Sequence, residues 1–369
     1  MLITRKYQWG LVLIITLTAV VSRLRFNGLI LDFDYGIYQP DGSHYAYRTL
    51  TFLGIDSNAA AERVVNWYQV HGIKNNIFPP SFLTPDNLET WGLSAPRILY
   101  SLLSVPFVYF FGLPGMLAIP IASFVLLVFS VFRMSELKEK QGIGFLLVLV
   151  LCTSPTVLRW MIANITDSLL AALFSVVALL LMSKVSIIYW YAGMSALVVC
   201  TSITRFSLPV WLAIAVVLWM KRMRFQSVWV FVLSALSFLP TFIYMPSSAV
   251  LPANAGAGIF TKILLLVKSF FEVGFVEIAQ LGAVDRILLV MLIVALVVAL
   301  RHIREDSSRY FLAVSLSVWV IGAINGTLGV NFRYQLPVLG FACWVILTNS
   351  TPFSDWFDRR RVNVVGKET

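Results

Sequence analysis

Residues 98–132 decide the fold, and they read ILYSLLSVPFVYFFGLPGMLAIPIASFVLLVFSVF. The stretch holds two apolar pieces, 98–111 and 115–132, separated by Gly112-Leu113-Pro114-Gly115. The first piece would make a helix about 21 Å long, which is short for a hydrocarbon core about 30 Å thick. The second is long enough to cross a bilayer. We therefore expect 98–111 to lie beside the membrane, or to re-enter it, and 115–132 to span it.

The distribution of basic residues supports the same division. Lys and Arg gather beside spans on the cytoplasmic side of membrane proteins. If only 115–132 spans, every later basic cluster falls on the side of the N-terminus; if both pieces span, every one falls outside. The clusters lie at 133–140, 184, 221–224, 301–309 and 359–361, and Arg5-Lys6 precedes the first apolar run. Both termini are therefore predicted to be cytoplasmic.

Counting outward from this stretch predicts an all-α, polytopic transmembrane helical bundle of about ten spans. The expected spans are 9–22, 115–132, 143–161, 166–182, 186–203, 206–220, 226–245, 284–300, 310–328 and 333–348. The first outer loop, about 23–114, would carry juxtamembrane helices, and the second, about 246–283, would hold a helix in the outer interface at 259–279. We expect one membrane domain, 1–369, with no separate soluble domain.

Composition supports a membrane protein and argues against several other classes. The chain is 59% hydrophobic and 12% charged, whereas soluble domains carry about 25% charged residues. The net charge of +10 lies in clusters beside spans, where it marks topology and attracts anionic lipid rather than nucleic acid. The three cysteines, Cys152, Cys200 and Cys343, lie inside apolar runs, so we expect them to be small core residues rather than disulfide partners or metal ligands. No His, Cys or Asp spacing predicts a zinc site, and no cofactor is indicated; a divalent cation shared by Asp41 and Asp167 stays an open alternative without support from the sequence. We expect the inner (plasma) membrane of a bacterium.

Ionisable side chains at membrane depth are costly, so they indicate function. By this topology they gather at the outer helix ends: Asp32, Asp34, Asp41, Arg48, Arg97, Asp167, Arg205 and Arg333. A carboxylate can take a proton from a hydroxyl, and arginines bind phosphate. The pattern therefore favours an enzyme that moves a group from a lipid phosphate to a hydroxyl on the extracytoplasmic side.

Five short elements follow one another in register with this topology. They are Asp41-Gly42-Ser43-His44-Tyr45, Arg97-Ile98-Leu99-Tyr100-Ser101-Leu102-Leu103, Asn164-Ile165-Thr166-Asp167, Ser202-Ile203-Thr204-Arg205 and Asn331-Phe332-Arg333-Tyr334-Gln335-Leu336-Pro337. Together they resemble the GT-C glycosyltransferases, multi-pass enzymes that use polyprenyl-phosphate sugars and include mannosyltransferase-like proteins of bacteria. Ser101 stands where that family usually has proline, and Phe206 stands where an acid is common.

The resemblance implies roles for the acids. Asp41 would be the general base, taking the acceptor's proton as its oxygen attacks the anomeric carbon with inversion. Asp34 is the chief alternative base, with Asp32 beside it. Asp167 would lie across the cavity and orient the acceptor or the sugar.

The resemblance also implies how substrate is held. Arg97, Arg205 and Arg333 would bind the donor phosphate, and His44, Tyr45 and Tyr334 would contact substrate. The acceptor would be a lipid, a glycan or a protein of the cell envelope.

Two other functions remain open at the level of sequence. A transporter or flippase for a lipid-linked or anionic substrate would favour charges near the bilayer midplane. A non-catalytic subunit of a membrane assembly would have retained the fold without the activity.

Overall fold

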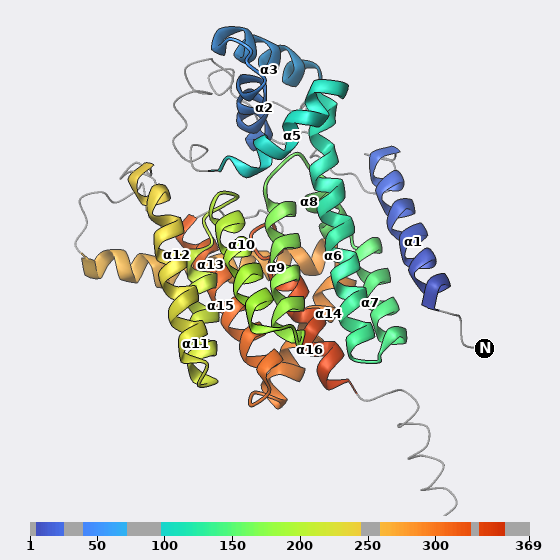
Figure 1. Ribbon diagram of the computed structural model, residues 1–369, viewed down its shortest axis with the longest axis vertical. Helices are drawn as coiled ribbons and strands as arrows, with labels where there is room; N and C mark the ends of the chain where they lie inside the picture. The colour runs from blue at the N-terminus through green and yellow to red at the C-terminus, as the bar shows by residue number, and fades with distance from the viewer. Residues whose placement is uncertain (1–4, 26–39, 72–96, 245–258, 326–331, 351–369) are drawn as a thin grey trace, which may run out of the picture.

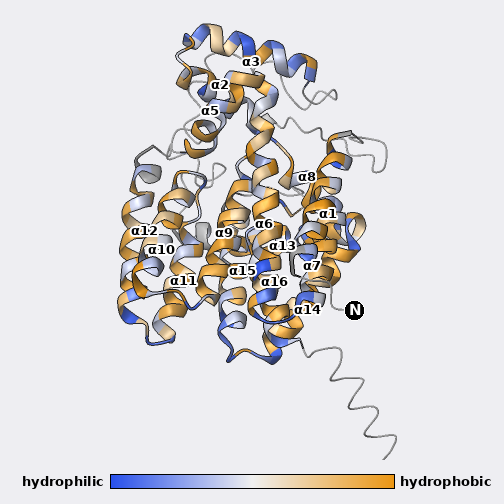
Figure 2. Ribbon diagram, turned by 45° about the vertical axis from the view of Figure 1, so that its right-hand side comes forward, coloured by the Kyte–Doolittle hydropathy of each residue, from blue (hydrophilic) through white to orange (hydrophobic). Residues whose placement is uncertain are grey.

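The computed structural model describes residues 5–25, 40–71, 97–244, 259–325 and 332–350 (Figure 1). Within these ranges the chain is all-helical and contains no strand. The expected all-α class is therefore confirmed. Figure 2 shows hydrophobic residues along the helices and hydrophilic residues at the turns that join them at one end of the bundle.

Most helices run alongside one another and form the bundle in Figure 1. Its members are α1 (Arg5–Arg25), α6 (Ala118–Leu137), α7 (Gln141–Thr153), α9 (Asp167–Met182), α10 (Ile187–Ser202), α11 (Leu208–Met220), α12 (Arg224–Tyr244), α14 (Arg286–Arg301), α15 (Asp306–Asn325) and α16 (Val338–Asn349). The core includes Phe174, Trp211 and Phe341, which are fully buried. The helix α9 is central, because it packs against α6, α10 and α16.

The contact between α9 and α16 is especially close. A Cβ atom added to Gly340 on α16 would lie 2.7 Å from the Cα atom of Ser175 on α9. No ordinary side chain fits in that space, so glycine is needed for the two backbones to touch. The consequence is a fixed spacing between the helix that begins at Asp167 and the helix that follows Arg333.

Three helices form a cap over one end of the bundle: α2 (Pro40–Phe52), α3 (Ser57–His71) and α5 (Leu99–Phe111) (Figure 1). The Tyr45 ring of α2 meets the Tyr100 ring of α5 edge to face at 5.4 Å. The Ser101 hydroxyl donates to the Tyr45 carbonyl at 3.1 Å. The expected helix at 98–111 therefore forms, and it holds α2 in place.

Among the described residues, two helical stretches are long and apolar enough, by length and composition, to cross a membrane. They are Tyr7–Leu24 and Leu113–Leu137, the second joining the 3₁₀ turn η2 (Leu113–Leu117) to α6. A third is added if α7 and α8 (Pro155–Met161) count as one bent span. Several remaining helices are apolar but shorter. The figure of about ten spans therefore stays a prediction.

The segment 143–161, expected as one span, is broken in the structure. The helix α7 ends at Thr153, and α8 turns away from it by 69°. Pro155 lacks an N–H and cannot continue α7, while the Ser154 hydroxyl caps α8 by accepting from the Val157 N–H at 3.0 Å. An apolar count cannot detect such a break.

A buried carboxylate, Asp285, holds this bend. It accepts hydrogen bonds from the Ser154 hydroxyl, from the Thr156 N–H at 3.1 Å and from the Leu288 N–H at 3.0 Å. The last of these caps the start of α14. One carboxylate thus satisfies donors at two helix beginnings, where backbone N–H groups lack partners within their own helix.

Two other boundaries differ from expectation. The last helix, α16, begins at Val338 rather than at 333, because residues 332–337 form turns that end at Pro337. The expected interface helix extends to α13 (Ile259–Val284), which lies across the bundle in Figure 1 and packs against α15 and α14.

Candidate functional site

Four charged side chains meet where the cap rests on the bundle, and we call them the charged cluster: Asp41, Asp167, Arg205 and Arg333. Asp41 is in the first turn of α2, and Asp167 is the first residue of α9. Arg205 lies in the turn between α10 and α11, and Arg333 in the turns before α16. All four are among the charged residues predicted at outer helix ends, and the structure brings them into contact.

Arg333 joins the two carboxylates. Its Nε donates to Asp167 Oδ2 at 2.9 Å, and its Nη2 donates to Asp41 Oδ2. Arg205 donates through Nη1 to the other oxygen of Asp167. The Asp167 side chain is only 3% exposed, whereas that of Asp41 is 27% exposed. Asp41 is therefore the carboxylate that an incoming molecule reaches first.

Arg97 adds a third positive charge beside the cluster. It is hydrogen-bonded to Tyr45, and its charge acts on Asp41. Three guanidinium groups against two carboxylates leave one positive charge in excess among these residues, which favours an anionic ligand.

The pKa of Asp41 follows from these neighbours. Burial alone would raise it, but Arg333, through its charge and hydrogen bond, and then Arg205 and Arg97 lower the pKa to about 2. While it is bound to Arg333, Asp41 is an ionised but weak base.

Two aromatic rings support the arginines. Tyr334 lies under Arg205, with 4.4 Å between the guanidinium carbon and the ring centre. Trp160 of α8 lies under Arg333 at 5.5 Å. Such cation–π contacts keep a guanidinium in place without neutralising it. Tyr334 is among the site residues predicted from the sequence. Trp160 is not, because nothing distinguishes this residue within its apolar run.

The close approach of α2 to the bundle explains the Asp-Gly pair. A Cβ atom added to Gly42 would lie 2.1 Å from Nδ2 of Asn164, in the turn that leads to Asp167. Asn164 is in turn hydrogen-bonded to the Tyr68 hydroxyl of α3. Gly42 therefore allows Asp41 to lie beside Asp167 and Arg333.

Other expected site residues lie behind the cluster or outside the described ranges. His44 and Tyr45 are 2% and 1% exposed, and the Tyr45 hydroxyl lies 3.3 Å from that of Thr166. Both are buried residues of α2 itself, so neither lies at the surface of the site. Asp34 and Asp32 fall in 26–39, outside the described residues. Phe206, at the position of the missing acid, packs edge to face on Phe238 at 5.9 Å.

A buried acid holds the turn that carries Arg333. Glu277 of α13 is fully buried and accepts a hydrogen bond from the Phe332 N–H. Phe332 has φ 65°, in the left-handed region that costs a non-glycine residue about 1–2 kcal/mol. Glu277 therefore stabilises the strained backbone beside Arg333. In the sequence Glu277 is one of four charged residues between 259 and 279, and nothing there separates it from Lys262, Lys268 and Glu272.

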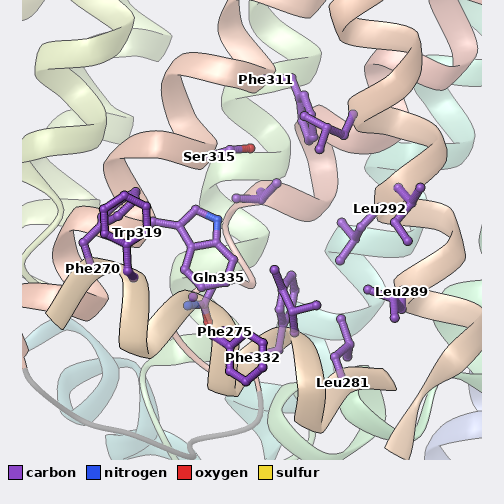
Figure 3. Close-up of a pocket in the computed structure, with 16 residues that line it drawn as sticks. Phe270, Phe275, Leu281, Leu289, Leu292, Phe311, Ser315, Trp319, Phe332 and Gln335 are labelled. Carbon is purple, nitrogen blue, oxygen red and sulfur yellow. The ribbon is translucent and has the colours of Figure 1, made fainter. Parts of the chain in front are cut away.

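An apolar groove of about 540 Å³ opens next to this turn (Figure 3). Its walls come from α13, α14 and α15, and Phe332, Gln335 and Val338 close one side. By contrast, the space bounded by Asp167, Arg205 and Tyr334 holds only about 10 Å³. In this structure the charged cluster is closed on itself. Besides the groove, a more open and more polar hollow of about 870 Å³ lies between α2, α3 and α5 of the cap.

Within the described part of the chain, no group of three or more His, Cys, Asp or Glu side chains is placed to hold a metal ion. Comparisons of the chain with protein-family models, with curated proteins and with solved structures give no match.

Proposed function

We propose that this protein is a membrane glycosyltransferase that moves a sugar from a polyprenyl-phosphate donor to a hydroxyl acceptor, with inversion. The observation that carries the proposal is the charged cluster, in which two arginines and two carboxylates from four distant segments meet beside an apolar groove. The resemblance to GT-C enzymes, including the mannosyltransferase-like ones, supports the same reaction.

The arginines provide the site for the donor phosphate. Arg205, Arg333 and Arg97 carry one positive charge more than the acids near them, and the rings of Tyr334 and Trp160 keep the first two in place. As the sugar leaves, the second negative charge that develops on the phosphate is stabilised by these guanidinium groups.

Asp41 acts as the general base once Arg333 turns to the phosphate. Losing that ion pair raises the pKa of Asp41 from its resting value of about 2. The carboxylate then takes the acceptor's proton while the acceptor oxygen forms a bond to the anomeric carbon. The carbon–oxygen bond to the phosphate breaks, and its electron pair leaves on the polyprenyl phosphate. Donor binding therefore activates the base.

The apolar groove accommodates the isoprenoid chain. Apart from Ser315 and Gln335, the residues that line the groove have apolar or aromatic side chains or are glycine. Two lining residues, Phe332 and Gln335, flank Arg333 and Tyr334 in the chain. A donor with its chain in the groove would present its phosphate near the charged cluster.

The proposal includes the membrane topology. About ten spans with cytoplasmic termini would place the cap and the charged cluster on the extracytoplasmic face of a bacterial inner membrane. At the far end, Lys221 pairs with Asp306 at 2.8 Å, and Arg133 pairs with Glu136 at 2.7 Å. These residues belong to the clusters that the positive-inside rule assigns to the cytoplasm.

The test is sugar transfer from polyprenyl-phosphate mannose and polyprenyl-phosphate glucose by purified protein in liposomes. Asp41→Asn should lower turnover by about 100-fold or more, since a general base contributes that much. The matched control is Glu136→Gln, an acid at the far end, which should leave turnover unchanged. Unchanged turnover in Asp41→Asn would overturn the role of Asp41. Movement of the lipid across the bilayer without any sugar transfer would favour a flippase.

A further inference from the structure

The apolar groove holds one polar side chain that its hydrocarbon walls cannot satisfy. Gln335 lines the groove and is only 1% exposed, yet within the described residues neither its Oε1 nor its Nε2 has a hydrogen-bond partner. Figure 3 shows its amide among the groove residues, close to Trp319, Phe275 and Phe332. A buried amide without partners costs about 1–3 kcal/mol, so native proteins rarely keep one without a reason.

The rest of the groove sharpens this observation. The 16 lining residues include two further side chains with a polar group, Trp319 and Ser315. The Ser315 hydroxyl also has no hydrogen-bond partner among the described residues. A serine hydroxyl rotates and can reach a carbonyl of its own helix. The amide of Gln335 has no such local solution, so it is the stronger sign of a missing ligand group.

The position of Gln335 indicates what that ligand group is. Gln335 is two residues from Arg333, on the turn that Glu277 stabilises through the Phe332 N–H. One side of this turn faces the charged cluster, and the other faces the groove. A molecule with its chain along Leu289, Leu292 and Phe311 would bring its head group to this turn.

We propose that Gln335 binds the head group of the lipid in the groove, its Nε2 donating to a phosphate oxygen while the apolar chain fills the space between α13, α14 and α15. That this lipid is an isoprenyl phosphate rests on the proposed function. Head-group recognition by a neutral amide on the groove side of the turn goes beyond that function. The Oε1 atom is then available to accept from a hydroxyl of the attached sugar.

The experiment measures the affinity of the full-length protein in detergent for farnesyl phosphate, farnesol and the hydrocarbon farnesene. Wild type should bind the phosphate most tightly and the hydrocarbon most weakly. Gln335→Leu, which keeps the volume, should weaken farnesyl phosphate by about tenfold or more, because a hydrogen bond to a charged group is lost. Its affinity for farnesene should not fall.

A second measurement separates recognition from folding. Gln335→Leu should raise the thermal midpoint of the empty protein, since it removes an unsatisfied buried amide, while it lowers affinity for the phosphate. A residue that only supports the fold would lower both. Gln335→Glu keeps the shape but replaces the donor with an acceptor or a charge, so it should weaken farnesyl phosphate at least as much.

The matched control is Gln280→Leu, because Gln280 is on α13 and does not line the groove. Its affinity for all three probes should equal that of wild type. Equal affinity of Gln335→Leu and wild type for farnesyl phosphate, with sugar transfer intact, would overturn the inference and leave the proposed function standing. Wild type that does not prefer farnesyl phosphate to farnesene would overturn both.

Discussion

Asp167 and Asp285 are both 2% exposed and both stand at the beginning of a helix, yet their surroundings differ. Asp285 accepts from one hydroxyl and two backbone N–H groups, all neutral. Asp167 accepts from two arginines, and one of these also holds Asp41. The neutral donors around Asp285 fix a bend between two helices. The arginines around Asp167 carry charge, and one of them is shared between two carboxylates, so this is the region to which the proposed function assigns the substrate.

Asp167→Asn should have the largest effect on stability and turnover of the variants considered. A small effect would contradict the difference drawn between Asp167 and Asp285. Removing one partner from a buried ionic network destabilises by about 3–5 kcal/mol, because the arginines keep their charge. Turnover per folded protein should also fall by about 100-fold or more, since the guanidinium groups lose their orientation. The thermal midpoint in detergent and the transfer assay measure the two effects. A variant that kept wild-type stability and turnover would reduce Asp167 to a helix-start residue.

Acid should weaken the charged cluster through Asp41. The folded pKa of this residue is about 2, below its ordinary value of 3.8, so its contribution is complete above about pH 4 and is lost as pH falls toward 2. The shift corresponds to about 2 kcal/mol. The thermal midpoints of wild type and Asp41→Asn, compared from pH 6 to pH 2, should differ by a constant amount above pH 4 and converge below it. A constant difference down to pH 2 would contradict the ion pair.

Asp285→Asn should cost less and leave the chemistry alone. An amide oxygen still accepts, so the variant should lose about 1–2 kcal/mol from weakened bonds to neutral donors. Turnover per folded protein should equal that of wild type. Transfer reduced as strongly as in Asp167→Asn would show that the bend at Ser154 belongs to the site, and the contrast between the two acids would disappear.

The far end of the bundle should give the smallest effect. The pair between Lys221 and Asp306 has side chains that are 24% and 47% exposed, and exposed pairs contribute about 0–1 kcal/mol. Lys221→Met should therefore change the thermal midpoint little and turnover not at all, at low salt and at high salt. A marked loss of turnover would show that charge at this end reaches the site.

Much of the helical architecture could be predicted because apolar runs end at polar turns. The helices α9, α10, α11 and α12 lie within two residues of the expected spans 166–182, 186–203, 206–220 and 226–245. The bend between α7 and α8 could not be predicted from hydropathy, because Ser154 and Pro155 change hydrogen bonding without changing the apolar count. How many of these helices span the membrane remains a prediction.

The candidate site could be predicted in part, since charges are rare enough in this chain to be sorted by helix end. Sorting by helix end predicts a shared site for Asp41, Asp167, Arg205 and Arg333, although they come from segments up to 292 residues apart. It could not find Trp160, Glu277 or Gln335. Their importance depends on which face of a helix or turn they occupy, and that follows from packing rather than from any local pattern.

The contact between Gly340 and Ser175 determines how the site can open. The backbones of α9 and α16 touch there, so Asp167 at the start of one helix and Arg333 just before the other belong to a single rigid frame. The cap is packed closely as well, with Gly42 against Asn164, but its acid, Asp41, has the most exposed side chain of the charged cluster. If the proposed substrate enters by breaking one ion pair of the charged cluster, the pair between Asp41 and Arg333 is the more exposed, while the pair between Arg333 and Asp167 lies within the frame.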